Sequence, residues 1–132
     1  MSKIVRETVV FAIKELQEQI FEQNRQVGWH SSPEGKPYTI QEQHDKFPTR
    51  IALCHSELSE ALEGYRKDLM DEHIPHLPNA AVELADAVIR ILELAEIMGW
   101  DLGHAIDLKL AYNKNRADHK PENRAKKNGK KI

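Results

Sequence analysis

Two carboxylate pairs lie inside apolar helical stretches of this chain, and they constrain its fold more than any other feature. The pairs are Glu57 with Glu60 and Glu83 with Asp86, and 22 residues separate Glu60 from Glu83. Residues three apart share one face of an α-helix, so each pair points its oxygens in one direction. Two such helices facing each other would bring four carboxylates together. Their mutual repulsion becomes tolerable only beside a hard cation such as Mg²⁺.

Apolar residues recur at spacings of three and four along four segments, a pattern that predicts four helices. The segments carry polar and charged side chains between the apolar positions, as helices with one buried face do. The expected helices cover residues 3–26, 48–67, 80–98 and 101–117.

Turn and capping residues separate these expected helices. Gly28 ends the first helix, and Gly99 is the expected left-handed cap of the third. Asn79 and Asp101 are predicted N-caps, and a capping box over residues 39–42 predicts a short helical turn. No alternating strand pattern is present. The predicted fold is therefore an all-α four-helix bundle.

The length and composition suit a single globular domain. The chain has 132 residues, of which 40% are hydrophobic and 30% charged. No window approaches the roughly 18 apolar residues of a membrane span, and the N-terminus lacks the apolar core of a signal peptide. We therefore expect a cytoplasmic protein without a membrane partner.

The net charge of −2 hides an asymmetry along the chain. From Lys114 onward eight basic residues face two acidic ones, whereas the preceding body holds 11 basic and 19 acidic residues. We expect a domain over residues 1–119 and a basic tail over residues 120–132. Because the body is acidic, a stable nucleic-acid complex is not expected, and the tail is interpreted as solvated with a local phosphate role.

Cys54 is the only cysteine, so no internal disulfide can form. It lies in an apolar stretch without a neighbouring base that would lower its pKa. We interpret it as a packed thiol rather than a nucleophile.

The surroundings of the carboxylate pairs favour a metal site over a solvated helix face. Leucine, alanine and valine flank both pairs, and burying an unpaired charge costs several kcal/mol. Few basic residues are near, with Arg50 before the first pair and Arg90 after the second. A divalent metal is therefore the expected counterion. Oxygen ligands without cysteine or histidine at ligand spacing favour Mg²⁺, with Mn²⁺ as the alternative, over Zn²⁺.

A second polar group lies downstream. Lys109, Asn113 and Arg116 are spaced i, i+4 and i+7, which predicts that they share one face of the fourth helix. Two cations and an amide at this spacing can bind a polyphosphate. The alternative is a solvated face with salt bridges.

Taken in order, these three elements resemble the signature of the MazG-like all-α nucleoside triphosphate pyrophosphohydrolases. This group includes dimeric dUTPases, dCTP pyrophosphatases and phosphoribosyl-ATP pyrophosphohydrolase. The resemblance covers residues 51–116, and Ser56 stands where many members have a further glutamate. It implies Mg²⁺-dependent hydrolysis of a nucleoside or deoxynucleoside triphosphate between the α and β phosphates, by a homodimer or homotetramer.

The resemblance also implies roles for individual side chains. Glu57 or Glu60 would double as the catalytic base. Lys109 and Arg116 would hold phosphates, and Asn113 would orient one of them. The metal ligands would be Glu57, Glu60, Glu83 and Asp86.

Trp29 and His30, which follow the first helix, are the candidates for base binding. In related dCTP-directed enzymes, aromatic and histidine side chains of the N-terminal region contact the nucleobase. An indole can stack on a base and an imidazole can hydrogen-bond to its edge. The alternative for Trp29 is a core anchor at the end of a helix.

Two other classes of protein compete with the enzyme. One is a non-enzymatic helical interaction module, whose basic tail would contact an acidic partner. The other is a di-iron carboxylate bundle, but those proteins use Glu-x-x-His motifs, and this sequence contains none.

Overall fold

The computed structural model describes residues 1–131, and their regular structure is helical. Two isolated bridges, Ser31 with Pro37 and Met70 with Pro78, are the only β pairing among these residues. The all-α prediction is confirmed. The long helices are α1 (Lys3–Gln26), α3 (Phe47–Arg66), α4 (Asn79–Ile97) and α5 (Leu102–Asn115). The short ones are α2 (Ile40–Asp45), the 3₁₀ turn η1 (Ala117–His119) and α6 (Pro121–Arg124).

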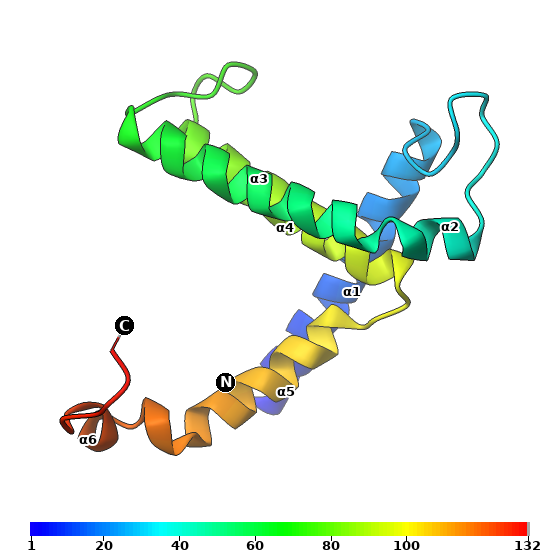
Figure 1. Ribbon diagram of the computed structural model, residues 1–132. Helices are drawn as coiled ribbons and strands as arrows, with labels where there is room; N and C mark the ends of the chain where they lie inside the picture. Colours follow the sequence, from blue (N-terminus) through cyan, green and yellow to red (C-terminus); the bar gives the residue numbers. More distant parts are fainter. Residues whose placement is uncertain (132) are drawn as a thin grey trace. The chain divides into compact units, whose positions relative to one another are not determined.

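The chain divides into two compact units, which are described separately (Figure 1). Unit 1 consists of Met1–Lys14 with Asp101–Ile132, and unit 2 is Glu15–Trp100. Helix α1 contributes to both units. The bundle arrangement of the four long helices and the domain boundary at residue 119 stay predictions.

The helix ends follow the signals in the sequence closely. Gly28 and Gly99 adopt φ angles of 91° and 71°, the left-handed conformation expected after α1 and α4. Thr39 and Glu42 form the predicted capping box of α2. Asp101 caps α5 by accepting a hydrogen bond from the backbone N–H of His104.

One predicted cap is wrong. Pro78 occupies the N-cap position of α4, and Asn79 is the first residue of the helix. The fixed φ of proline suits the start of a helix, which leaves the Asn79 side chain available for another contact.

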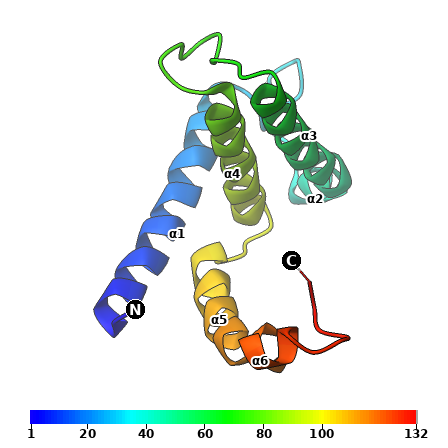
Figure 2. The ribbon, with the colours of Figure 1, turned by 90° about the vertical axis from the view of Figure 1, so that its left-hand side faces the viewer.

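Unit 2 is built around the helical hairpin of α3 and α4, which lie side by side in both views (Figure 1 and Figure 2). Small side chains are buried on these helices, namely those of Cys54, Ala61 and Ala87. Small residues let the backbones of α3 and α4 approach closely, so that longer side chains along the edges of this contact can reach one another. The packed-thiol interpretation of Cys54 is confirmed, and burial raises its pKa.

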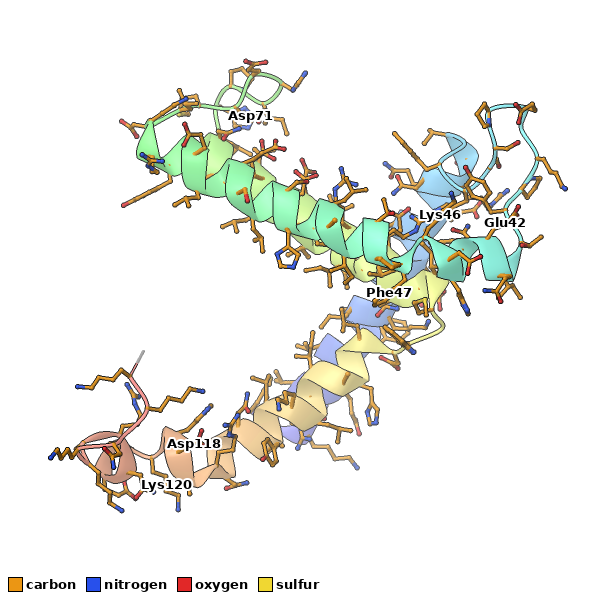
Figure 3. All side chains as sticks on the ribbon, viewed as in Figure 1. Glu42, Lys46, Phe47, Asp71, Asp118 and Lys120 are labelled. Atoms are coloured by element: carbon orange, nitrogen blue, oxygen red, sulfur yellow. The ribbon has the colours of Figure 1, made fainter. Side chains whose placement is uncertain are left out.

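The connection between α3 and α4 is tied down by backbone groups. The Asp71 carboxylate, visible in this loop in Figure 3, accepts hydrogen bonds from the backbone N–H groups of His73 and Ile74 at 2.9 and 2.7 Å. The backbone N–H of Asn79 donates to the carbonyl of Leu69 at 2.9 Å. These bonds fix where α4 begins relative to the end of α3.

Unit 1 joins the first half of α1 to α5. The Arg6 guanidinium donates two hydrogen bonds to Asp107, at 2.6 and 2.7 Å. Gly103 is buried against α1, where the backbone of Val10 leaves no room for a side chain. The absence of a side chain at residue 103 therefore permits this helix contact.

Many large apolar side chains remain exposed on the helices. On the α3–α4 hairpin they include Leu58, Leu62, Tyr65, Leu84 and Val88, each at least 47% exposed. Among the described residues, no helix combines the length and apolar character needed to cross a membrane.

Candidate metal and nucleotide site

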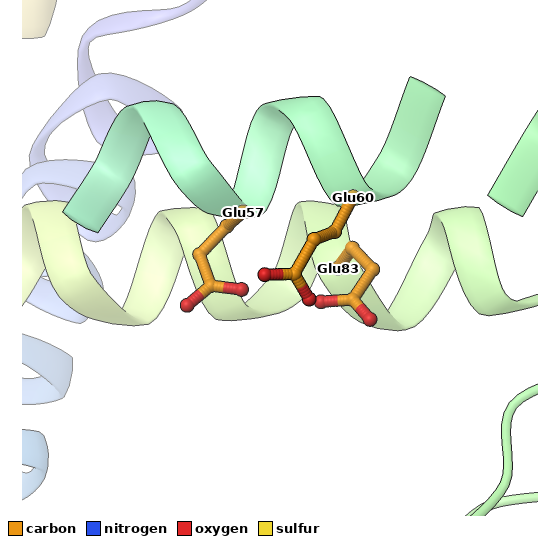
Figure 4. A group of neighbouring side chains, drawn as sticks. All are labelled: Glu57, Glu60 and Glu83. Carbon is orange, nitrogen blue, oxygen red and sulfur yellow. The ribbon is translucent and has the colours of Figure 1, made fainter. Parts of the chain in front are cut away.

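Three of the four predicted carboxylates meet between α3 and α4. Glu57, Glu60 and Glu83 each offer an oxygen, and these oxygens lie within 4.8 Å of one another (Figure 4). Glu57 is buried, Glu83 half-buried and Glu60 exposed. Asp86 is not part of this group and lies about one turn further along α4.

The local structure explains why these side chains converge. The spacing of Glu57 and Glu60 places both on the side of α3 that meets α4. Glu83 lies on the first turns of α4, opposite the second half of α3. The hairpin thus brings together residues that lie more than 20 positions apart in the sequence.

One carboxylate of the cluster already has a cationic partner. The Arg90 Nε donates to Glu57 Oε1 at 2.5 Å. The expectation that a metal alone compensates these charges is therefore incomplete. Arg90 neutralises one carboxylate, and Glu60 and Glu83 remain as the pair open to a cation.

Glu83 is the carboxylate of this cluster whose pKa is raised. Burial raises its pKa, and the neighbouring Glu60 and Glu57 raise it further, whereas a hydrogen bond from Asn79 lowers it. The Asn79 amide donates to Glu83 Oε1 at 3.0 Å, the contact that replaces its predicted capping role. A cation at this position would relieve the repulsion.

A cavity of about 530 Å³ opens further along the same hairpin. Its walls combine one exposed indole, two arginines, two carboxylates, an amide and two aliphatic side chains. The lining residues are Asn24, Trp29, Arg50, Leu53, Asp86, Ile89, Arg90 and Glu93. Asp86 and Arg90 therefore connect the carboxylate cluster to this cavity.

The two predicted base-binding residues lie in very different surroundings. Trp29 is 70% exposed and lines the cavity, so the core-anchor alternative does not apply to it. His30 is only 3% exposed, with its ring against Phe21 at a centroid distance of 4.4 Å. Its Nε2 lies 2.8 Å from Glu93 Oε1, and its Nδ1 lies 3.0 Å from Gln43 Nε2.

These contacts define the hydrogen-bonding state of His30. The Glu93 carboxylate can only accept, so the His30 Nε2–H donates to it. The Gln43 oxygen accepts from Arg50 Nη2 at 2.6 Å, which turns the amide N–H toward His30 Nδ1. Both ring nitrogens of His30 are used inside the protein.

Glu93 is the centre of this buried network. It is 8% exposed, and Asn24 donates a second hydrogen bond to its Oε1 at 2.9 Å. Burial pushes the pKa of Glu93 up, but the hydrogen bonds from His30 and Asn24 and the charge of Arg50 outweigh it and leave the pKa below its ordinary value. Glu93 is therefore held as a carboxylate at neutral pH.

The predicted phosphate-binding residues belong to unit 1. Helix α5 ends at Asn115, so Lys109 and Asn113 are helical, whereas Arg116 adopts an extended conformation just beyond the helix. The prediction that all three share one helical face is wrong for Arg116. Its guanidinium pairs with Asp118 through hydrogen bonds of 2.9 and 2.6 Å.

Lys109 and Asn113 differ in how their polar atoms are satisfied. The Lys109 ammonium lies 4.8 Å from the centre of the Tyr112 ring. Asn113 Oδ1 is buried and has no hydrogen-bond partner among residues 1–131. A buried acceptor left unpaired is costly, so this amide is available to a donor brought by a ligand.

Sequence reasoning missed the roles of Arg90 and Glu93. These residues follow Glu83 at i+7 and i+10, so they continue the polar face of α4 that begins with Glu83 and Asp86. That periodicity was the available signal. Their partners, Glu57 and His30, lie 33 and 63 residues away, and no local pattern points to them.

Comparison with known proteins gave no relative on which to rest an assignment. No protein-family model matches the chain, and no curated protein and no solved structure matches it either.

Proposed function

We propose that this protein hydrolyses a nucleoside or deoxynucleoside triphosphate between the α and β phosphates, releasing the monophosphate and pyrophosphate in a Mg²⁺-dependent reaction. The observation that supports the proposal most is the convergence of Glu57, Glu60 and Glu83 within 4.8 Å. A cavity with an exposed indole and two arginines lies beside them. The order of the motifs in the sequence, which resembles the MazG-like enzymes, supports the same reaction.

The donor set fits a hard divalent cation. Carboxylate oxygens are the ligands that Mg²⁺ and Mn²⁺ favour, and the described cluster contains no histidine or cysteine. Glu60 and Glu83 would hold the ion together with Glu57, and Asp86 would complete the set through a bound water or the substrate. When bound, Mg²⁺ would neutralise phosphate charge and orient the triphosphate.

The protein's own side chains would position the water and the phosphates. Glu60 is exposed and has no cationic partner among the described contacts, so it suits the role of base better than Glu57, which is occupied by Arg90. Lys109 and Asn113 would contact phosphate oxygens. Arg116 would have to exchange Asp118 for phosphate, an exchange between two anionic partners of its guanidinium.

A homodimer or homotetramer is part of the proposal. The α3–α4 hairpin exposes leucines and a tyrosine, and a second copy would cover these apolar side chains. Light scattering coupled to size-exclusion chromatography is expected to give a mass of two or four chains. A single-chain mass would contradict this part of the proposal.

The reaction is tested by measuring pyrophosphate release from a panel of canonical and damaged NTPs and dNTPs with Mg²⁺. At least one of them is expected to yield equal amounts of monophosphate and pyrophosphate. Release of inorganic phosphate alone, or no release from any nucleotide, would refute the proposed reaction.

Stabilisation by metal separates the enzyme from the alternative, a non-enzymatic helical interaction module. An ion that binds only the folded state at ten times its Kd adds about 1.4 kcal/mol to the free energy of unfolding. We therefore expect Mg²⁺ to raise the melting temperature by roughly 3–6 °C in differential scanning fluorimetry. NaCl at equal ionic strength is the control. An equal shift with both salts would favour the module.

A further inference from the structure

We infer that Glu93 and Arg50 read the edge of a nucleobase that carries an exocyclic amino group beside a ring nitrogen acceptor, while the base stacks on Trp29. This inference rests on the proposed function and names its substrate class. It assigns base recognition to two residues that the sequence did not single out for it, and it makes His30 a positioning residue rather than a base contact.

The location of the cavity supports this assignment. Glu83, Asp86, Arg90 and Glu93 form one polar stripe along α4. Ten residues of helix span about 15 Å, so the stripe leads from the carboxylate cluster to the cavity wall at Glu93. A nucleotide with its phosphates at the cluster would place its base at the Glu93 end.

Glu93 offers the base a fixed acceptor. Both hydrogen bonds found for it, from His30 and Asn24, end on Oε1. Neither of these bonds uses the second oxygen, Oε2, and this oxygen is not a buried, unpaired atom among the described residues. We infer that it faces the cavity. A carboxylate cannot donate, so Oε2 selects an N–H group on the ligand.

Arg50 offers the complementary donor. Its guanidinium lines the same cavity and is anchored by one hydrogen bond, from Nη2 to Gln43. The Nε–H of Arg50 is buried without any partner in the described residues. A guanidinium has five donors and no acceptor, so the remaining donors suit a ring nitrogen or carbonyl oxygen of a ligand.

The remaining walls suit the faces of a planar base. The Trp29 indole is exposed at the cavity, and Leu53 and Ile89 add apolar surface. Base stacking on an aromatic side chain adds affinity for any base, because every base has a π-face. The stacking surface therefore supplies affinity, and the Glu93–Arg50 pair supplies selectivity.

Because Glu93 accepts hydrogen bonds and Arg50 donates them, the pair distinguishes classes of base. Cytosine and adenine present an amino donor next to a ring nitrogen acceptor, which matches the Glu93 acceptor and the Arg50 donor. Uracil, thymine and hypoxanthine present a carbonyl oxygen where the amino group would be, and that oxygen would face the Glu93 carboxylate. Two acceptors facing each other in a buried site are strongly disfavoured.

The test compares matched pairs of substrates that differ only at this group, dCTP with dUTP and dATP with dITP. Wild-type protein is expected to give kcat/KM values roughly 10- to 100-fold higher for the amino member of at least one pair. Which pair shows the larger ratio identifies the ring size that the cavity accepts. Equal values within both pairs would overturn the inference.

Two variants assign the preference to its residues. Glu93→Gln supplies an amide that can donate as well as accept, and it is expected to reduce the amino-to-carbonyl ratio by about tenfold. His30→Gln is expected to reduce the same ratio through loss of the Glu93 orientation. Glu63→Gln, an exposed glutamate on α3, is the matched control and is expected to keep the wild-type ratio.

A binding measurement on protein with Glu93 and His30 intact tests the inference without turnover. It also does not depend on whether the variants at these two buried residues fold. The chain has two tryptophans, so in a Trp100→Phe background the fluorescence reports on Trp29 alone. Amino-bearing monophosphates, dCMP or dAMP, are expected to quench this signal at lower concentrations than dUMP or dIMP. If no triphosphate is hydrolysed, the proposed reaction is wrong. Equal quenching by the amino-bearing and the carbonyl-bearing monophosphates would overturn this inference, whatever the result for hydrolysis.

Discussion

Replacement of Glu60 by Gln is expected to reduce kcat/KM for pyrophosphate release by roughly 10³-fold, because it removes a proposed metal ligand that is also the proposed catalytic base. The Gln side chain has nearly the same size, and Glu60 is exposed, so the helical circular dichroism should stay unchanged. Pyrophosphate release at saturating Mg²⁺, measured beside the melting curve of the variant, checks both points.

The chain offers a matched control for this substitution. Glu63 lies three residues further along α3, where it pairs with Lys67 and Arg66 at the surface. Glu63→Gln removes the same charge from the same helix outside the carboxylate cluster, and it should retain wild-type turnover. If Glu60→Gln were as active as Glu63→Gln, the assignment of the cluster would be wrong.

Gly103→Ala is expected to lower the free energy of unfolding by about 1–3 kcal/mol, the cost of overpacking a close contact. An added Cβ would lie 2.7 Å from the carbonyl oxygen of Val10 and 3.2 Å from both Val10 Cα and Ile13 Cβ. A backbone oxygen cannot rotate away, so α1 and α5 would have to separate. Urea unfolding followed by circular dichroism measures the loss.

The sign of this effect is informative, because Gly to Ala normally stabilises a helix by up to about 1 kcal/mol. Ala105→Gly, at an exposed position of the same helix, calibrates that propensity in α5. A more stable Gly103→Ala protein would show that the two helices are not in close contact at Val10.

The helices themselves were largely predictable, because their limits depend on local chemistry. Gly28, Gly99 and the Thr39 capping box act through the conformation of neighbouring residues, and each behaves as the sequence indicates. The two errors have local causes as well. Proline at residue 78 displaced Asn79 from the cap, and α5 stopped at Asn115 instead of including Arg116.

The candidate site was predictable only in part. The spacing of Glu57 and Glu60 predicts that they share one face of α3. Glu83 joins them because α4 packs against that face. The exclusion of Asp86 from this group depends on how the two helices are aligned, which the sequence does not encode locally. The pairing of Arg90 with Glu57 depends on the same alignment.

The cavity lined by Trp29, Arg50 and Glu93 could not be predicted from the sequence, because its polar groups pair with residues far away along the chain. His30 and Trp29 are adjacent, yet one is buried and the other is exposed. The difference arises because Glu93, Gln43 and Phe21 surround His30 from three helices. The resemblance to related enzymes implies base contacts for both residues, whereas only Trp29 is exposed at the cavity and His30 is buried beside Glu93.

A Mn²⁺ titration followed by electron paramagnetic resonance tests whether the carboxylates of α3 and α4 hold a divalent ion. Free Mn²⁺ gives a sharp signal that is lost on binding, so the bound fraction is counted without any assay of turnover. The wild-type protein and Glu63→Gln are expected to bind Mn²⁺, with Mg²⁺ as a competitor. The Glu60→Gln, Glu83→Gln double variant is expected to lose this binding. Unchanged binding in the double variant, or none in the wild type, would contradict the proposed metal site.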